Sequence, residues 1–434
     1  MQFLDIRDKD FDARFAAILA RGEETGRDVE EVVKGIIADV RTRGDEALLE
    51  YTRRFDRLDT DSVAALEVTE DEFNEAFARV KDEEIAALKL AVERVARFHE
   101  KQRQETWLST HEEDILLGQM VTPLERVGIY VPGGKASYPS SVIMNAVPAR
   151  VAGVGEVVMV APTPGGEINP HVLVAARLSG VDRVFRTGGA QAVAALAYGT
   201  ATVPRVDKVT GPGNIYVATA KKLVFGQVGI DMIAGPSEIL VVSDGSGTPA
   251  HIAADLLSQA EHDELASSIL ITTSRPFGEK VAAEVERQLG ELSRESIARA
   301  SWEKFGAVIV AGSLDEAVAF ANRIAPEHLE LAVANPFEVL PRIRNAGAVF
   351  LGHFTPEAAG DYLAGPNHTL PTGGTARFFS PLSVDDFVKK TSVVYFSEKG
   401  LNRLGPDIVR IAGLEGLEAH GKSVGIRLGK GESR

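Results

Sequence analysis

Short apolar runs alternate with helix-like stretches from Arg126 onwards, and this alternation limits the fold more than any other feature of the chain. A short run buried on both faces is typical of a strand in a parallel sheet, whose return connection is a helix. One series of such runs lies between residues 127 and 210, and a second lies between 239 and 351. The pattern therefore predicts an α/β fold with two doubly wound lobes and mostly parallel sheets.

The two ends of the chain have a different pattern of apolar residues. Residues 29–55 and 71–104 carry apolar side chains at helical spacing between charged neighbours, which predicts a helical N-terminal region. The tail contains an apolar run at 393–396 and a helix expected to end near His420. The predicted fold class is α/β, with two Rossmann-like lobes, a helical N-terminal region and a small C-terminal tail domain.

Charge and cysteine content exclude several classes of protein. The formal net charge of −15 over 434 residues argues against nucleic acid and anionic membrane as partners, because both require a basic face. The chain has no cysteine, so disulfides, thiolate metal ligands and a thiol nucleophile are excluded. Without an apolar segment at its charged beginning, or any stretch long enough to span a bilayer, it is expected to be cytoplasmic.

A glycine-containing turn follows the apolar run at 208–210. The segment Gly211-Pro212-Gly213-Asn214 lies where a strand would pass into a helix, and glycines there allow a diphosphate to approach the backbone. The full G-x-G-x-x-G fingerprint is absent, so an ordinary tight turn explains this segment equally well.

Gln259 and His262 are spaced so that one helix face would carry both side chains. Such a pair can point at one metal ion, although a solvated helix face is the more common explanation. Zinc can be held by nitrogen and oxygen atoms alone, and a ligand set with few formal charges leaves the ion acidic toward a substrate oxygen.

Glu327 and His328 place a carboxylate beside an imidazole between apolar residues. Because adjacent strand residues point to opposite faces, this pair is expected at a bend or at the start of a strand. A base that titrates near neutral pH and a second carboxylate are what proton removal from an alcohol and from water requires. A buried structural histidine beside a surface glutamate is the alternative.

Residues 360–374 form a glycine- and proline-rich stretch that contains Asp361 and His368. Loops of this composition often carry function, but an ordinary surface loop is the more common explanation. The remaining histidines outside the tail have no supporting context and are interpreted as structural; they are His99, His111, His171, His251 and His353.

Taken together, these motifs resemble the histidinol dehydrogenase family. The resemblance rests on segments that occur in family order over nearly the whole chain: Tyr130-Val131-Pro132-Gly133-Gly134, Gly188-Gly189-Ala190-Gln191, Gly211-Pro212-Gly213-Asn214, Ala234-Gly235-Pro236-Ser237-Glu238, Gln259-x-x-His262, Pro326-Glu327-His328 and Asn367-His368-Thr369-Leu370-Pro371-Thr372.

The resemblance implies two NAD-dependent oxidations that convert L-histidinol, through the aldehyde, to L-histidine. It implies Glu327 and His328 as the catalytic acid/base pair, and Tyr130, Gln191 and Asn214 as cofactor contacts. It implies one zinc ion per subunit, with Gln259, His262, Asp361 and His420 as ligands. The residues implied near the substrate are these four together with Ser237, His328, His368 and Glu415.

The same resemblance implies a homodimer in which the tail of one subunit completes the site of the other. The corresponding division of the chain is an arm at 1–25, a zinc and substrate domain at 26–129 and 237–381, an NAD-binding domain at 130–236, and a dimer-exchange tail at 382–434.

The absence of cysteine constrains the second oxidation. Many enzymes that oxidise aldehydes form a thiohemiacetal on a thiolate, and this chain cannot. Water must then attack the aldehyde, which we assign to activation by Glu327, with His328 as the base for the alcohol proton. Three alternatives stay open on the sequence: a paralogue that oxidises another amino alcohol or a diol, a metal-dependent hydrolase that uses Glu327, and a silent NAD- or metal-binding protein.

Overall fold

The computed structural model describes residues 1–19, 27–133 and 138–429. The chain forms two compact units, one made of Met1–Gln102 and Leu124–Phe387 and the other of Arg103–Pro123 and Val388–Arg434. Residues 20–25 of the predicted arm and Gly134 of the predicted loop lie outside the described residues. The predicted boundaries of the arm, the two lobes and the tail stay predictions.

The first unit contains a six-stranded sheet in which every neighbouring pair is parallel. The strand order is β1-β11-β10-β9-β12-β13. The strands are β1 (Gln2–Asp5), β9 (Glu238–Ser243), β10 (Ser267–Thr272), β11 (Ala307–Val310), β12 (His328–Ala332) and β13 (Ala348–Leu351).

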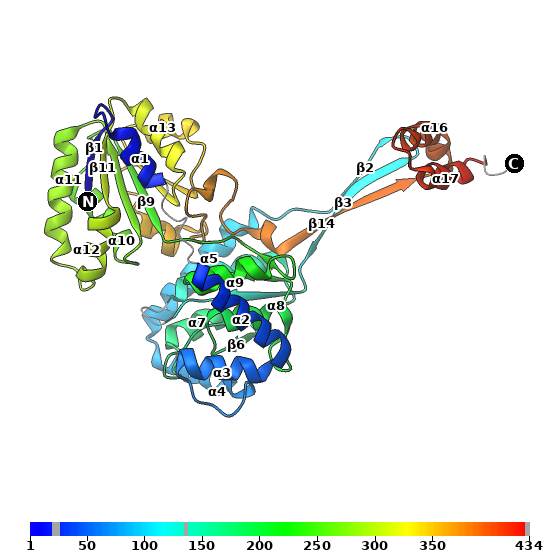
Figure 1. The fold of residues 1–434 in the computed structure, drawn as a ribbon, viewed down its shortest axis with the longest axis horizontal. Helices are drawn as coiled ribbons and strands as arrows, with labels where there is room; N and C mark the ends of the chain where they lie inside the picture. The colour runs from blue at the N-terminus through cyan, green and yellow to red at the C-terminus, as the bar shows by residue number, and fades with distance from the viewer. Residues whose placement is uncertain (20–26, 134–137, 430–434) are drawn as a thin grey trace. The chain divides into compact units, whose positions relative to one another are not determined.

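Helices cover both faces of this sheet, because its strands carry apolar side chains on both sides. Successive residues of a strand point to opposite faces. Leu240 and Ile271 pack with one set of helices, and Val241 and Leu270 pack with another. Figure 1 shows helices on both sides of the sheet. The first set is α1 (Phe11–Leu19) and α13 (Leu314–Ile324). The second set is α10 (Pro249–Ala260), α11 (Arg275–Leu289) and α12 (Glu295–Phe305).

A second, five-stranded parallel sheet lies in the same unit, with the order β6-β5-β4-β7-β8. Its strands are β4 (Arg126–Tyr130), β5 (Glu156–Val160), β6 (Arg183–Phe185), β7 (Lys208–Thr210) and β8 (Gly229–Ile230). One face packs on α4 (Glu70–Arg79), α5 (Asp82–Glu100), α6 (Pro139–Ala152) and α7 (Pro170–Leu178). The other face packs on α2 (Arg27–Arg43), α3 (Asp45–Asp56), α8 (Gly189–Tyr198) and α9 (Ile215–Val224).

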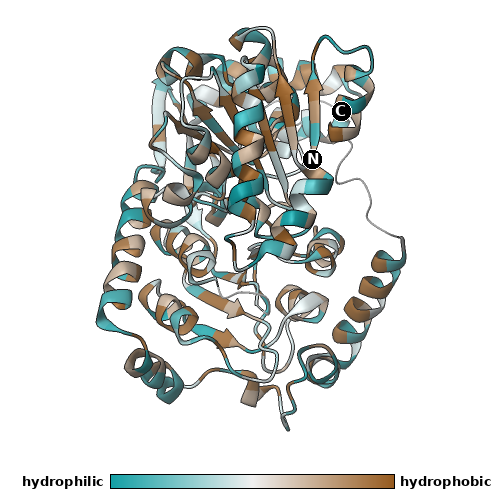
Figure 2. Cartoon of the chain, turned by 90° about the vertical axis from the view of Figure 1, so that its left-hand side faces the viewer, coloured by the Kyte–Doolittle hydropathy of each residue, from teal (hydrophilic) through white to brown (hydrophobic). Residues whose placement is uncertain are grey.

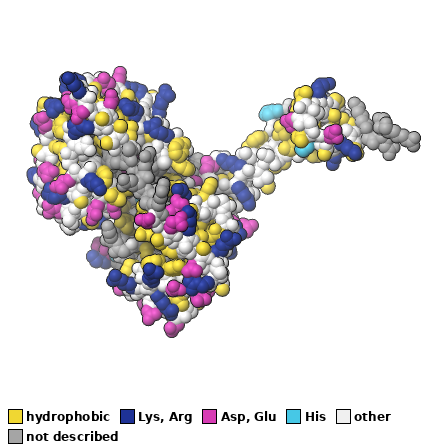
Figure 3. Space-filling view, in the orientation of Figure 1, with side chains coloured by type: hydrophobic (Ala, Val, Ile, Leu, Met, Phe, Trp, Pro, Cys, Tyr) yellow, Lys and Arg dark blue, Asp and Glu magenta, His cyan; other side chains and the backbone are white. Residues whose placement is uncertain are grey.

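The distribution of hydropathy explains why these layers form. In Figure 2 the strands are mostly hydrophobic, whereas many surrounding helices carry hydrophobic and hydrophilic residues on different faces. Figure 3 shows acidic and basic side chains interspersed on the face in view, as expected for side chains in contact with water. Of the helices in the described part of the chain, none is both long and apolar enough to cross a bilayer.

The second unit is a three-stranded antiparallel ribbon followed by two helices. Its strand order is β14-β3-β2, and the strands are β2 (Trp107–Glu112), β3 (Ile115–Pro123) and β14 (Val388–Phe396). The helices are α16 (Glu398–Leu414) and α17 (Glu418–Arg427).

The expected α/β class and the parallel strands are confirmed. The predicted helix end near His420 is wrong, because α16 ends at Leu414 and His420 lies inside α17. The break falls at Gly416, whose φ of 70° suits glycine and cannot continue a right-handed helix.

Candidate functional site

Three turns meet at the carboxyl ends of the five-stranded sheet, where open parallel sheets usually bind ligands. They follow β4, β6 and β7, and Tyr130 at the end of β4 joins the other two. The Tyr130 hydroxyl accepts a hydrogen bond from the Gly189 backbone N–H at 3.0 Å. A Cβ on Gly211 would lie 2.1 Å from the Tyr130 carbonyl oxygen, so only glycine allows this close approach.

Gln191 lies in the first turn of α8, and its side chain is buried. Neither its amide oxygen nor its amide nitrogen has a hydrogen-bond partner among the described residues. Burying an unpaired amide costs free energy, so an external ligand or water is the natural partner of this group.

The turn Gly211–Asn214 joins β7 directly to α9, as the sequence predicts. Asn214 is exposed and caps the helix, because its Oδ1 accepts from the N–H groups of Tyr216 at 3.0 Å and Val217 at 3.2 Å. The sequence-predicted cofactor residues Tyr130, Gln191 and Asn214 therefore occupy one edge of one sheet.

The Glu327–His328 pair lies where the chain enters β12, which confirms the expected position at a strand start. Ala325 adopts a φ of 51° just before Pro326, and His328 is the first strand residue. Both side chains of the pair are buried, with residue exposures of 6% and 3%. The interpretation of Glu327 as a surface glutamate is therefore wrong.

One residue, Glu238 at the start of β9, holds both members of this pair through its backbone. Its N–H donates to Glu327 Oε2 at 2.8 Å, and its carbonyl oxygen lies 3.0 Å from His328 Nδ1. A carbonyl oxygen only accepts, so Nδ1 carries the proton in neutral His328. Nε2 is then the basic nitrogen, and it has no hydrogen-bond partner among the described residues.

Nε2 of His328 faces a second carboxylate, since Asp361 Oδ1 lies 3.7 Å away. Asp361 lies in η3 (Gly360–Ala364), a π-helical turn that directly follows α15 (Glu357–Ala359). Like Nε2 of His328, Asp361 Oδ1 is buried and lacks a hydrogen-bond partner in the described part of the chain. The protein leaves both buried atoms without a hydrogen-bond partner, so a bound ion or substrate is the natural partner of both.

Glu357 belongs to the same cluster, and the sequence analysis missed it. Its Oε1 lies 3.6 Å from His328 Nδ1, and its Oε2 accepts from Ser258 Oγ at 3.3 Å. Ligand atoms of His328, Glu357 and Asp361 all lie within 4.8 Å of one another. The spacing of Glu357 and Asp361, four residues apart before a glycine-rich loop, was the available signal.

Burial and charge set the protonation of this cluster. Desolvation raises the pKa of Glu327 to about 8 and that of Glu357 to about 7, although His328 opposes both shifts. Burial lowers the pKa of His328, but the attraction of Glu357, Glu327 and Asp361 outweighs it, so the net pKa is well above the usual value. Proton exchange near neutral pH is thus available at this site.

Two further histidines lie near Asp361. Burial lowers the pKa of His262 and of His368, and the Asp361 carboxylate opposes the shift in both. Each imidazole is then neutral near pH 7 and keeps a lone pair, which is the form that binds metals. His368 Nε2 is buried and has no hydrogen-bond partner in the described ranges.

The expectation that one helix carries both Gln259 and His262 is corrected. Helix α10 ends at Ala260, and His262 lies in the following turn. The His262 N–H donates to the Gln259 carbonyl at 3.2 Å. Gln259 is buried, and its Oε1 has no hydrogen-bond partner among the described residues. The unpaired oxygen atoms of Gln259 and Asp361 fit a cation that accepts N/O ligands, such as zinc.

Three predicted residues remain, one in the first unit and two in the second. Ser237 precedes β9 and is partly buried, and its carbonyl accepts from the Ser267 N–H at 3.0 Å. Glu415 and His420 belong to the second unit and are exposed, with Glu415 just after α16.

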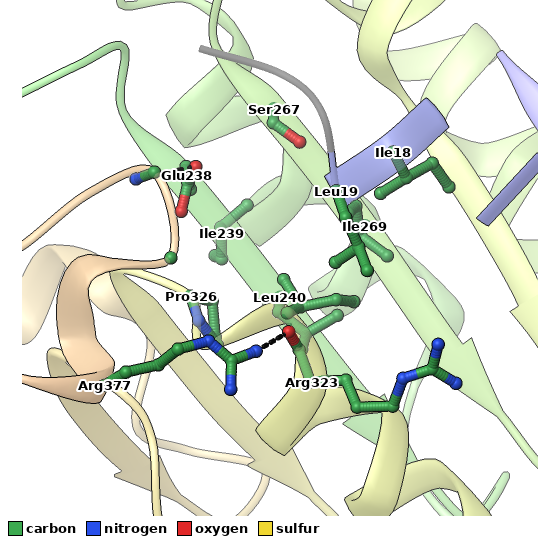
Figure 4. A pocket seen from close by; sticks show the side chains of 13 residues that line it. Ile18, Leu19, Glu238, Ile239, Leu240, Ser267, Ile269, Arg323, Pro326 and Arg377 are labelled. Atoms are coloured by element: carbon green, nitrogen blue, oxygen red, sulfur yellow. Dashed lines mark hydrogen bonds between the residues drawn. The ribbon is translucent and has the colours of Figure 1, made fainter. Parts of the chain in front are cut away.

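A cavity of about 300 Å³ lies beside the amino ends of β9 and β10 (Figure 4). Glu238 and Pro326 line it, but Glu327 and His328 are not among its lining residues. Arg377 reaches across its edge and donates to the Arg323 carbonyl (Figure 4). This cavity therefore borders Glu238, which holds the Glu327–His328 pair, rather than the pair itself.

Two parallel sheets, one with a glycine-rich turn edge and one with a buried imidazole–carboxylate cluster, define an α/β protein with an enzyme-like site. The family model described as histidinol dehydrogenase matches residues 19–428. The chain belongs to the histidinol dehydrogenase family, a family of oxidoreductases.

Similar proteins carry the same name. The chain is 88% identical to histidinol dehydrogenase from Geobacter metallireducens, with 100% of both chains covered. It is also 88% identical to that from Geobacter sulfurreducens, over 99% of this chain and 100% of the relative. The crystal structure of histidinol dehydrogenase from Elizabethkingia anophelis matches with a TM-score of 0.93 at 38% identity, covering 99% of this chain and 98% of the other.

The close approach at Gly211 leads to a stability prediction. Gly211→Ala and Gly226→Ala both place a side chain at positive φ, 108° and 96° respectively, which costs about 1–3 kcal/mol. A Cβ at Gly226 meets nothing within 4 Å, whereas at Gly211 it meets a backbone carbonyl. In urea unfolding, Gly211→Ala is expected to lose clearly more stability than its matched control. Equal losses would contradict a sterically locked turn.

Proposed function

We propose that this chain oxidises L-histidinol through L-histidinal to L-histidine, the final steps of histidine biosynthesis, with two NAD molecules reduced per turnover. The observation that carries the proposal is the buried Glu327–His328 pair held by Glu238, in a chain without cysteine. Membership of the histidinol dehydrogenase family supports the substrate. A biosynthetic reaction of this kind also favours a cytoplasmic location.

His328 is assigned as the base for the alcohol. Its Nε2 accepts the hydroxyl proton while hydride leaves the carbinol carbon for NAD, which gives the aldehyde and the first NADH. The Glu238 carbonyl fixes the ring orientation through Nδ1, and the carboxylates around the ring stabilise the imidazolium that forms. The geometry therefore supports a base that is oriented before substrate arrives.

Glu327 is assigned as the activator of water for the second oxidation. Its carboxylate takes a proton from water as the water oxygen adds to the aldehyde carbon, which gives the hydrate in its ionised form. Loss of hydride from this ionised hydrate to the second NAD then gives the carboxylic acid and the second NADH. Its raised pKa of about 8 suits a group that both takes and returns protons near neutral pH.

Gln259, His262, Asp361 and His420 are proposed to hold one zinc ion per subunit. When bound, zinc supplies Lewis acidity toward the substrate oxygen and orients the substrate. The unpaired Gln259 Oε1 and Asp361 Oδ1 support this set. Glu357 is proposed to orient His328 instead of binding zinc, since both of its oxygens already face protein groups.

The cofactor is proposed to bind at the turn edge of the five-stranded sheet, with Tyr130, Gln191 and Asn214 as contacts. The buried, unpaired amide of Gln191 is the main support. The substrate is proposed to contact Ser237, His328 and His368, besides the zinc ligands and the tail residue Glu415.

The second unit supports a homodimer with shared sites. This unit has almost no hydrophobic core of its own. Among its described residues, Ile115 and Ala412 are the hydrophobic residues that are buried. Many of its large apolar side chains are exposed, and a surface of this kind requires a covering partner. The exposed set is Trp107, Leu108, Leu117, Met120, Val394, Tyr395, Ile408, Ile411, Leu414, Leu417 and Ile426. We propose a second copy of this chain as that partner.

Stoichiometry tests the proposed reaction. The purified enzyme is expected to form about two NADH per histidinol consumed, because the hydrate route needs two hydride transfers. A ratio of one in the wild type would indicate a simple alcohol dehydrogenase.

Two substitutions separate the two oxidations. In Glu327→Gln, aldehyde oxidation is expected to fall by about 10²-fold or more, with the alcohol step less affected, so that trapped aldehyde accumulates. His328→Asn is expected to impair both steps.

Metal content gives an independent test. Chelation is expected to remove both zinc and activity, and added zinc should restore them, because N/O ligands bind with moderate and pH-dependent affinity. His262→Ala is expected to lose zinc, whereas His171→Ala, at a partly exposed histidine of α7, and Glu357→Gln are expected to keep it. Full activity in verified metal-free protein would overturn the ligand assignment.

Complementation tests the shared site. Inactive His262→Ala and His420→Ala chains are refolded together, so that random pairing makes about half of the dimers mixed. If His420 serves the partner subunit, each mixed dimer has one intact site and activity recovers to at most about a quarter of wild type. No recovery, with subunit exchange shown by tagged chains, would rule out exchange of His420.

A further inference from the structure

Lys221 and Asp231 form a buried ion pair beneath the turn at the end of β7. Their side chains are 2% and 1% exposed, and the ammonium group contacts Asp231 Oδ1. Lys221 lies in α9, and Asp231 directly follows β8. No motif in the sequence analysis includes either residue, and the proposed reaction does not use them.

Both charged groups hold the backbone of Gly211. Lys221 Nζ donates to the Gly211 carbonyl oxygen at 2.9 Å, and the Gly211 N–H donates to Asp231 Oδ2 at 2.8 Å. Asp231 Oδ1 also accepts from the Met232 N–H at 2.6 Å. The pair thus satisfies every polar group of the glycine backbone and fixes the start of the segment that leads to β9.

Stability alone does not explain this arrangement. Burying two charges is costly, and apolar residues of similar volume often stabilise a protein equally well. What the pair provides is geometry: it fixes a glycine at a φ of 108°, against the Tyr130 carbonyl, at the beginning of the Gly211–Asn214 turn. Because Lys221 and Asp231 already fix the Gly211 backbone, the turn needs no reordering when a ligand binds.

We infer that Lys221 and Asp231 are positioning residues for the dinucleotide cofactor, which hold the Gly211–Asn214 turn in its binding conformation before the cofactor arrives. This inference rests on the proposed binding of NAD at that turn. The pair acts through the backbone of Gly211, so its loss weakens cofactor binding while the Glu327–His328 chemistry is retained.

The test is the double variant Lys221→Met/Asp231→Asn, which removes both charges together and leaves no uncompensated buried ion. Its matched control is Arg183→Met/Glu67→Gln, which removes a half-buried pair with contacts of 2.7 and 2.8 Å at the opposite, amino end of the same sheet. The dissociation constant for NAD is measured by calorimetry on the zinc-loaded enzyme, together with kcat and KM for NAD.

The charge-free Lys221/Asp231 variant is expected to bind NAD at least about tenfold more weakly, with kcat at saturating NAD within about threefold of wild type. The control pair is expected to keep the wild-type dissociation constant. Unchanged NAD affinity in a folded Lys221/Asp231 variant overturns the inference. Failure of the wild-type enzyme itself to bind NAD contradicts the proposed function instead, so the two failures are distinguishable.

Hydrogen exchange on the wild-type enzyme keeps the inference testable if the double variant does not fold. Without NAD, the amides of Gly211 and Met232 are expected to exchange slowly, because the ion pair already holds them. Rapid exchange that becomes slow only on adding NAD would show that the cofactor, and not the ion pair, orders the turn, and would overturn the inference.

Discussion

The two hydrogen bonds of the Glu238 backbone are the interactions on which the candidate site depends. One N–H fixes the Glu327 carboxylate and one carbonyl fixes the tautomer of His328. Their geometry follows from the parallel pairing of β9 and β12, in which His328 lies opposite Ile239. Because a register shift of one residue would turn every side chain to the other face, the hydrophobic pattern that fixes the sheet also fixes the Glu327–His328 pair.

The same site shows what function costs in stability. Glu327, Glu357, Asp361 and His328 are brought together in a nearly dry environment, where like charges repel and each ion loses its hydration. A cluster optimised for stability alone would be apolar. A cation and a substrate would supply the missing partners of the charged cluster, and their binding energy would stabilise the loaded enzyme. The unpaired atoms of Gln259 and Asp361 are consistent with that explanation.

The five-stranded sheet holds a backbone turn in a conformation that only glycine adopts readily. Tyr130 touches two turns at once, through its hydroxyl at Gly189 and its carbonyl near Gly211. The Lys221–Asp231 pair completes the support from below. Fixed donors and fixed steric limits of this kind lower the entropy cost of binding a flexible ligand such as a dinucleotide.

The sequence by itself determined the class of fold, because runs such as 157–160 and 239–242 are apolar at every position and only parallel strands covered on both faces accommodate them. It also indicated the start of β12 at Glu327–His328, and its motifs in family order led to the family. Glu357, the clamp by Glu238, the Lys221–Asp231 pair and the end of α10 before His262 were decided only by the tertiary structure. These depend on which residues distant in sequence become neighbours, and strand order and register set that proximity, whereas local periodicity reports only which face of an element is buried.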